Sequence, residues 1–115
     1  QGPVFNFSDI FLYENETKLK VIKDQTFLTQ ALTERSIAFI EKNKNNPFFL
    51  FLSHPQPHVP LFVSEKFKGT SNRKLYGDVI QEIDNSVGQI IKALKERDLE
   101  KNTIIISIAQ LNHKA

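Results

Sequence analysis

A proline-rich segment limits what this chain can fold into. Residues 53–60 read Ser-His-Pro-Gln-Pro-His-Val-Pro, so three of the last six positions are proline. Proline lacks a backbone N–H and fixes φ, which excludes both a helix and regular sheet pairing in this segment. Residues 48–52, just before it, form a short apolar run that is typical of a central parallel strand. The sequence therefore predicts a buried strand that leads into a stiff, extended loop.

Apolar periodicity predicts two helices and a second strand around this loop. Helical spacing of apolar residues indicates a first helix over residues 26–44, with Asp24 or Thr26 as its N-cap. The i, i+3, i+4, i+7 pattern over residues 76–94 indicates a second helix. Residues 103–108 are apolar and β-branched, as in a second buried strand.

The order of these elements predicts an α/β fold. Helix, strand, helix and strand with short connections favour a parallel sheet covered by helices. We expect residues 26–108 to form this core. Residues 1–25 are expected to be an irregular first segment with one or two short strands, and residues 109–115 to be a separate tail.

Composition excludes several classes of protein. Fifteen Lys and Arg against thirteen Asp and Glu leave a net charge of +2, too small to predict a nucleic-acid partner. The chain has no cysteine, which removes disulfides, thiolate metal sites and thiol nucleophiles. No stretch approaches the roughly 20 apolar residues of a membrane span. We therefore expect neither a nucleic-acid partner nor a membrane span.

Ligands of open parallel sheets bind beyond the carboxyl ends of the strands, which places residues 53–60 and 109–115 at the candidate site. His54 and His58 are four residues apart, but the prolines exclude the helix that would turn them into a metal-binding pair. A histidine in such a loop is either a packed or solvent-facing residue or a donor to an anionic group. The residues alone leave this choice open.

Charged residues near the second helix have simpler interpretations. Asp78, Glu82 and Asp84 are interpreted as a solvated flank or as caps rather than as catalytic acids or bases. The basic residues of the stretch 66–74 are interpreted as a solvated loop that could border the entrance for an anionic substrate.

Four blocks of the sequence, taken in order, closely resemble the sulfatase family, in particular arylsulfatase-type enzymes. They are Asn-Pro-Phe-Phe-Leu-Phe-Leu at 46–52, Pro-His-Val-Pro-Leu-Phe at 57–62, Tyr-Gly-Asp-Val-Ile-Gln-Glu-Ile-Asp-Asn-Ser-Val-Gly at 76–88, and residues 99–106. The resemblance covers residues 26–108. Its most specific parts are the Pro-His-x-Pro loop and the Tyr-Gly-Asp helix.

The resemblance implies part of a catalytic domain with an alkaline-phosphatase-like α/β sandwich. Such enzymes hydrolyse sulfate esters with a formylglycine nucleophile and a calcium ion. By position, His58 takes the role of the family histidine that contacts the substrate sulfate, whereas His54 has no matched role and is left as structural or peripheral. The family suggests a lysosomal, extracellular or periplasmic location, and the residues themselves do not decide it.

The sequence also departs from the family pattern. The nucleophile motif, Cys-x-Pro-x-Arg or its serine form, is missing from these residues. The Asp-Asn pair that supplies calcium ligands is replaced by Gln110 and Leu111, and leucine offers no oxygen. We therefore expect no catalytic residue and no metal ligand in this chain, no cofactor of its own although the complete family enzyme holds calcium, and a piece that is inactive alone.

Two alternatives remain open. The chain could be a non-catalytic binding or interaction module that keeps the anion-contacting His58 loop and pairs with another chain through an exposed sheet edge. Alternatively, it does not fold alone, because the gain from burial is close in size to the entropy cost of ordering the chain.

Overall fold

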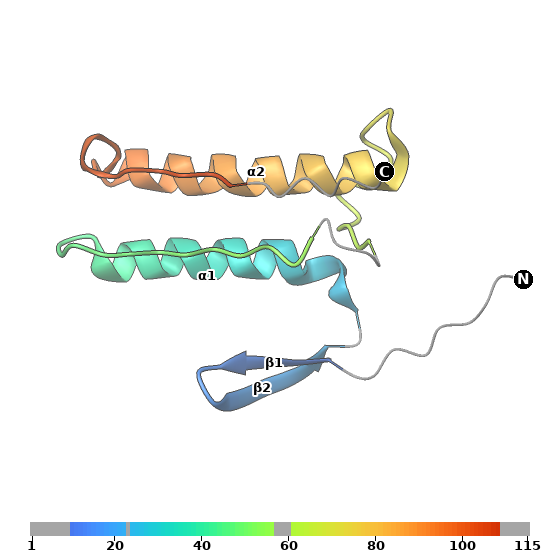
Figure 1. Cartoon of the computed structure of the whole chain (residues 1–115), viewed down its shortest axis with the longest axis horizontal. Helices are drawn as coiled ribbons and strands as arrows, with labels where there is room; N and C mark the ends of the chain where they lie inside the picture. Colours follow the sequence, from blue (N-terminus) through green and yellow to red (C-terminus); the bar gives the residue numbers. More distant parts are fainter. Residues whose placement is uncertain (1–9, 23, 57–60, 109–115) are drawn as a thin grey trace, which may run out of the picture.

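The computed structural model describes residues 10–22, 24–56 and 61–108, which form a β-hairpin followed by two long helices (Figure 1). The two helices were predicted within two residues of their observed ends. None of the helices in these ranges combines the length and the apolar character that a membrane span requires. The elements are β1 (Ile10–Glu14), β2 (Thr17–Ile22), the 3-10 helix η1 (Gln25–Phe27), α1 (Leu28–Asn43), α2 (Lys74–Glu96) and the 3-10 helix η2 (Glu100–Asn102).

The first segment contains two short strands, in agreement with the one or two that the sequence predicted. Strands β1 and β2 are antiparallel, and Asn15 in the turn between them has a φ of 54°, a left-handed conformation that asparagine tolerates. The ammonium group of Lys18 lies 3.7 Å from the centre of the Phe11 ring. An ion pair between Glu14 and Arg35 connects the hairpin to α1.

The first helix begins where the sequence placed it. The carboxylate of Asp24 accepts a hydrogen bond from the backbone N–H of Thr26 at 3.0 Å, which confirms Asp24 as the cap of η1 and, through it, of the helical region.

The two long helices pack through a small core. Ile40 and Val79 are each 1% exposed, and the hydroxyl oxygens of Thr33 and Ser86 lie 2.5 Å apart between the helices. Small hydroxyl side chains allow a close approach, and their hydrogen bond satisfies both polar groups.

The helices α1 and α2 run in the same direction (Figure 1). Their carboxyl ends therefore lie together, where Nε of Arg97 contacts Oε2 of Glu41 at 2.5 Å. Parallel neighbouring helices require the intervening chain to cross back, as in a βαβ-type arrangement.

The predicted parallel sheet is not formed by the described residues. Residues 48–52 and 103–108 are extended, but they are not assigned as strands, and the described residues form a sheet only at the hairpin. A strand is defined by backbone hydrogen bonds to a neighbouring strand. The two apolar segments have no such neighbour among the described residues, so they are not assigned as strands. The two predicted helices are therefore confirmed, whereas the predicted parallel strands and their sheet are not confirmed by the described residues.

Candidate functional site

The expected site residues fall partly outside the described ranges. His58, the expected substrate contact, and Gln110 and Leu111, at the positions of the family's Asp-Asn pair, are among the residues that the structure does not describe. The residues on either side of the His58 loop are described. Those before and after it are joined by a hydrogen bond, and those after it are attached to α2 by side-chain hydrogen bonds.

Gln56 connects the two sides of the proline-rich loop. Its side chain is buried, with 6% exposure, and its Oε1 accepts a hydrogen bond from the backbone N–H of Phe62 at 3.2 Å. The bond fixes the separation of two residues that flank His58. Gln56 was not recognised from the sequence, because a single glutamine between prolines has no periodic or motif signal.

Glu82 of α2 anchors the chain a few residues later. Its Oε1 accepts from the backbone N–H of Ser64 at 3.1 Å, and its Oε2 accepts a hydrogen bond from the Ser64 hydroxyl. The neighbouring Val63 is buried. A buried carboxylate that accepts two hydrogen bonds is satisfied without a cation, so its role in these contacts is to hold the loop.

Asp78 anchors the next turn of the same loop. Its Oδ2 accepts from the N–H of Gly69 and its Oδ1 from the N–H of Ser71, both at 2.8 Å. Gly69 has a φ of 77°, a conformation that L side chains rarely adopt. These two hydrogen bonds lower the pKa of Asp78 below its ordinary value of 3.8, and the bond from Gly69 has the larger effect.

These contacts correct the interpretation of the acidic residues as a solvated flank. Asp78 and Glu82 are 3% and 5% exposed, whereas Asp84 is exposed as expected. Their burial follows from their i, i+4 spacing next to the apolar stripe, which places both carboxylates on the side of α2 that the loop covers. The Asp of the Tyr-Gly-Asp motif is therefore a loop anchor.

Gly77 allows the loop to approach the helix closely. A Cβ atom at this position would lie 2.1 Å from Oγ of Ser71 and 2.7 Å from Cβ of Arg73. No side chain fits at such distances, so the glycine is required by the contact between the 71–73 turn and α2.

We expect Gly77→Ala to destabilise the chain by about 1–3 kcal/mol through overpacking. Gly88→Ala is the matched control, because Gly88 lies in the same helix with no atom within 4 Å of a built Cβ. That change should stabilise by roughly 0.5–1 kcal/mol from helix propensity. Urea unfolding followed by circular dichroism measures both, and effects of the same sign at the two positions would contradict the prediction.

We expect the stability of the chain to depend on Asp78 in acid. Because its pKa is lower in the folded than in the unfolded state, its contribution is complete above the ordinary value of 3.8 and is lost as the pH falls through the folded pKa. The urea midpoint of Asp78→Asn should therefore fall less than that of the wild type between about pH 5 and pH 2. The exposed Asp84→Asn is the control and should follow the wild type, and identical pH profiles for Asp78→Asn and wild type would contradict the prediction.

His54, the other loop histidine, is half-buried. Its Nδ1 is buried and has no hydrogen-bond partner in the described part of the chain. Burial lowers the pKa of His54 below 6.5, so the imidazole is mainly neutral at pH 7. A neutral, partly buried imidazole is less suited than a cationic one to bind an anionic group. No described contact gives His54 a role beyond packing.

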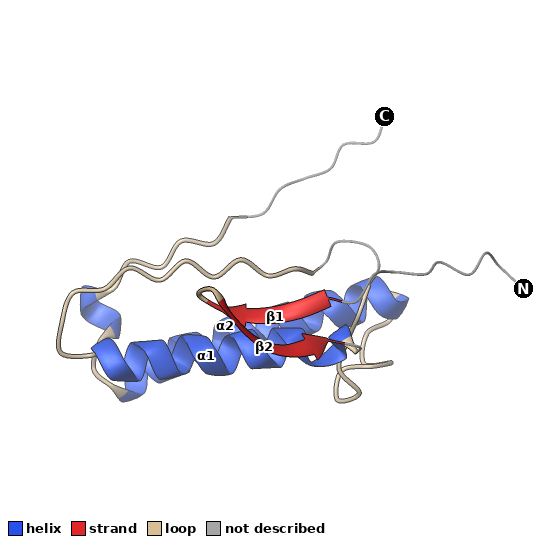
Figure 2. Cartoon of the chain, turned by 90° about the horizontal axis from the view of Figure 1, so that it is seen from below, coloured by secondary structure: helices blue, strands red, loops and turns tan. Residues whose placement is uncertain are grey.

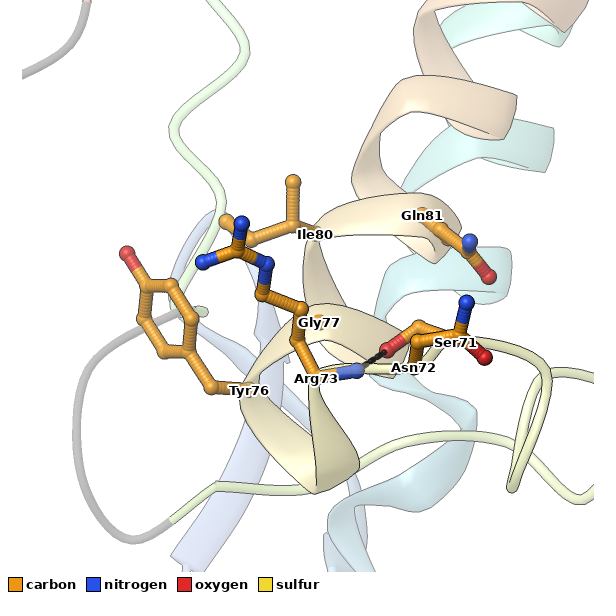
Figure 3. A pocket seen from close by; sticks show the side chains of 7 residues that line it. All are labelled: Ser71, Asn72, Arg73, Tyr76, Gly77, Ile80 and Gln81. Atoms are coloured by element: carbon orange, nitrogen blue, oxygen red, sulfur yellow. Dashed lines mark hydrogen bonds between the residues drawn. The ribbon is translucent and has the colours of Figure 1, made fainter.

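A shallow hollow of about 420 Å³ lies at the start of α2 (Figure 3). Arg73 and Tyr76 lie on one side of it, and Ser71 and Gln81 lie on the other (Figure 3). The backbone N–H of Arg73 donates to Oγ of Ser71 at 2.9 Å, which closes the turn. The cationic side chains of the 66–74 stretch are exposed, which confirms a solvated loop.

The described residues do not assemble a metal site. In ranges 10–22, 24–56 and 61–108, no three His, Cys, Asp or Glu side chains are placed to hold an ion. The carboxylates of Asp78 and Glu82 already accept N–H and O–H donors. Calcium takes about six to eight oxygen ligands, and Leu111 at the family's Asn position supplies none. Gln110 and Leu111, which the resemblance places at the calcium-ligand positions, lie outside the described residues, so the expected loss of this calcium site stays a prediction.

Comparison with known proteins identifies the class. The family model named Sulfatase matches residues 2–109. The arylsulfatase of Hemicentrotus pulcherrimus is 37% identical over 99 residues, which cover 86% of this chain and 18% of that protein. Human steryl-sulfatase is 45% identical over 78 residues, which cover 68% of this chain and 13% of that protein.

A solved structure gives the same result. A protein from the metabolism of multiple glycosaminoglycans by Bacteroides thetaiotaomicron superposes with a TM-score of 0.68 at 31% identity, over 70% of this chain and 17% of that one. The fold is therefore similar to part of that solved structure. The chain belongs to the sulfatase family, and it spans less than a fifth of the length of the relatives named here.

Proposed function

We propose that these residues form part of the catalytic domain of a sulfuric ester hydrolase of the arylsulfatase type, and that His58 contacts the sulfate group of the substrate. The observation that carries the proposal is the match of the Sulfatase family model to residues 2–109, a range that includes the Pro-His-x-Pro loop. The names of the relatives, arylsulfatase and steryl-sulfatase, support a sulfate ester as substrate.

The chemistry of histidine suits this role. An imidazole can donate a charge-assisted hydrogen bond to a sulfate oxygen and can stabilise charge that develops on the transferred group or on the leaving oxygen. The Gln56–Phe62 hydrogen bond and the Glu82–Ser64 contacts fix the chain around the loop, so that little freedom is lost on binding.

These 115 residues alone are proposed not to hydrolyse sulfate esters. They lack the Cys-x-Pro-x-Arg or Ser-x-Pro-x-Arg nucleophile motif, and Leu111 removes a metal ligand. The calcium of complete enzymes would supply positive charge at the sulfate, and this chain does not hold it. What its own residues contribute is the His58 loop and the supports that position it.

A chimeric enzyme tests the proposal. Residues 26–108 of this chain replace the aligned residues of the Hemicentrotus pulcherrimus arylsulfatase, and we call this protein the core chimera. We expect the core chimera to hydrolyse an aryl sulfate and the isolated 115-residue chain to show no turnover above buffer. A folded but inactive core chimera, or turnover by the isolated chain, would contradict the proposal.

A second candidate function is a non-catalytic binding or interaction module. It is favoured by the exposure of large apolar side chains, for example Phe49 at 85% and Ile104 at 88%, which resembles a surface that another chain covers. Equilibrium titration of the isolated chain with an aryl sulfate tests whether a ligand is bound: saturable binding that His58→Ala removes would support this function.

A further inference from the structure

Two Asn-x-Ser/Thr motifs in the sequence have the pattern that accepts an N-linked glycan. They are Asn-Phe-Ser at residues 6–8 and Asn-Glu-Thr at residues 15–17. The first lies outside the described residues, whereas the second forms the turn of the β-hairpin and the start of β2. Three residues match such a pattern often by chance, so the structural setting of the motif decides whether it can carry a glycan.

The hairpin turn presents the side chain of Asn15 to solvent. Glu14 and Thr17 are the last paired residues of the hairpin, so Asn15 and Glu16 are the two residues that connect its strands. All four of these residues are exposed. In the described part of the chain, the side-chain amide of Asn15 makes no hydrogen bond. Its nitrogen, the atom to which an N-linked glycan is attached, is therefore accessible.

The backbone of the turn is compatible with a modified side chain. The φ of 54° at Asn15 is a left-handed conformation, which asparagine adopts more readily than most other residues. This conformation involves only the backbone of Asn15. Thr17, whose hydroxyl completes the motif, is exposed at the first position of β2, where a β-branched residue is favoured. The hairpin and a glycan therefore make compatible demands on both residues.

The turn lies at the outside of the described structure. The hairpin lies beside α1, on the side away from α2 (Figure 1). In the view from the hairpin side, no described segment covers the turn (Figure 2). The ion pair next to the turn also stays open to water, because the side chains of Glu14 and Arg35 are 49% and 63% exposed. A glycan is bulky and polar and needs such a surface.

The charges of the turn favour a surface position in a complete sulfatase as well. Glu14 and Glu16 lie on either side of Asn15, and Glu16 has no ion pair with any described residue. Covering these carboxylates with further residues would cost free energy unless each gained a partner. A turn of this composition is therefore expected to remain in water when the rest of the enzyme is present.

We propose that Asn15 is an N-glycosylation site, modified when the chain passes through a secretory pathway that contains an oligosaccharyltransferase. The co-reactant is an oligosaccharide linked to a lipid pyrophosphate. The amide nitrogen of the Asn15 side chain forms a bond to the anomeric carbon of the first sugar, while the bond from that carbon to the pyrophosphate oxygen breaks. The lipid pyrophosphate leaves, the amide nitrogen releases one proton, and nothing is oxidised or reduced.

Secretion of the 115-residue chain tests whether Asn15 is modified. The chain carries a signal peptide and the substitution Asn6→Gln, which leaves residues 15–17 as its one motif, and it is expressed in a eukaryotic host. We expect an intact mass one glycan above that of the protein part, and we expect peptide N-glycosidase to remove the difference. Because transfer acts on the emerging chain, the result does not depend on how well the isolated chain folds. A secreted chain without a glycan would overturn the proposal.

Two substitutions of Thr17 provide matched controls. Thr17→Ser keeps the hydroxyl that the motif requires and should keep the glycan. Thr17→Val keeps the shape and the β-branched character of threonine but removes the hydroxyl, so the glycan should be lost. A glycan that persists in Thr17→Val would show that it is not attached through this motif, which also contradicts the proposal.

A chimera tests whether the turn is at the surface of a complete sulfatase. Residues 10–108, which lie within the range matched by the Sulfatase family model, replace the aligned residues of the Hemicentrotus pulcherrimus arylsulfatase. We expect this protein to be secreted with a glycan at Asn15, at the same yield and with the same circular dichroism as its Asn15→Gln variant. Retention of the glycosylated form alone would show that the complete fold covers the turn, and the proposal would be wrong. Sulfatase activity is not measured, so the result is independent of the proposed function.

Discussion

His58→Ala is expected to lower kcat/KM of the core chimera for an aryl sulfate by about 10²–10³-fold, the loss typical of one donor to a transition-state oxyanion. The reason is that the imidazole would contact the sulfate where negative charge develops. Most of the loss should appear in kcat, because an interaction that strengthens in the transition state affects the chemical step more than binding. Steady-state kinetics of the purified variants measure both constants.

His54→Ala is the matched control for this prediction. It removes a histidine four residues away that is half-buried and has its pKa lowered by burial. We expect it to change kcat/KM by less than about tenfold, as for a side chain that acts only through packing. Equal losses for the two variants, or a larger loss for His54→Ala, would show that the wrong histidine has been assigned to the sulfate.

A chimera that also carries the tail, residues 26–115, should be at least about 10³-fold less active than the core chimera. By the family resemblance, the tail would place Gln110 and Leu111 at the positions of the family's Asp-Asn pair. A bound metal contributes several kcal/mol of charge stabilisation, and each 1.36 kcal/mol corresponds to a factor of ten in rate. Turnover of an aryl sulfate at saturating calcium compares the two chimeras.

Restoring the ligands distinguishes a lost metal site from a damaged fold. In the longer chimera, the double substitution Gln110→Asp and Leu111→Asn changes only the two positions that correspond to the family's Asp-Asn pair. We expect it to recover most of the lost activity and calcium affinity, the latter measured by calorimetry. Full activity of the unrestored longer chimera would show that these two positions do not matter to the metal.

The helices were predictable because their signal is local. The apolar stripe of α2 and the cap at Asp24 depend on residues within a few positions of each other. The strands differ, because residues 48–52 carry the composition of a buried strand but their pairing depends on a neighbour that the described residues do not provide. Composition therefore indicates a buried strand at residues 48–52, but the sheet that would bury it is not formed by the described residues.

The loop anchors were missed for a different reason. Apolar periodicity assigns polar residues to the solvent side of a helix, so Asp78 and Glu82 were interpreted as exposed although both are buried. A usable signal was present: two acids four residues apart beside the apolar stripe, preceded by the turn at Gly69 with free backbone N–H groups to bind. Buried carboxylates with such donors nearby are anchors more readily than catalysts.

Because α1 and α2 are parallel, the two ends of the helix pair can be changed for different purposes. At one end, the Glu41–Arg97 ion pair joins the carboxyl ends of α1 and α2. Both extended segments, residues 48–52 and 103–108, run away from that end and back along the helices (Figure 1). Substitutions around the ion pair therefore lie a helix length away from the far ends of both extended segments, so thermostability can be selected there without changing the chain at those far ends.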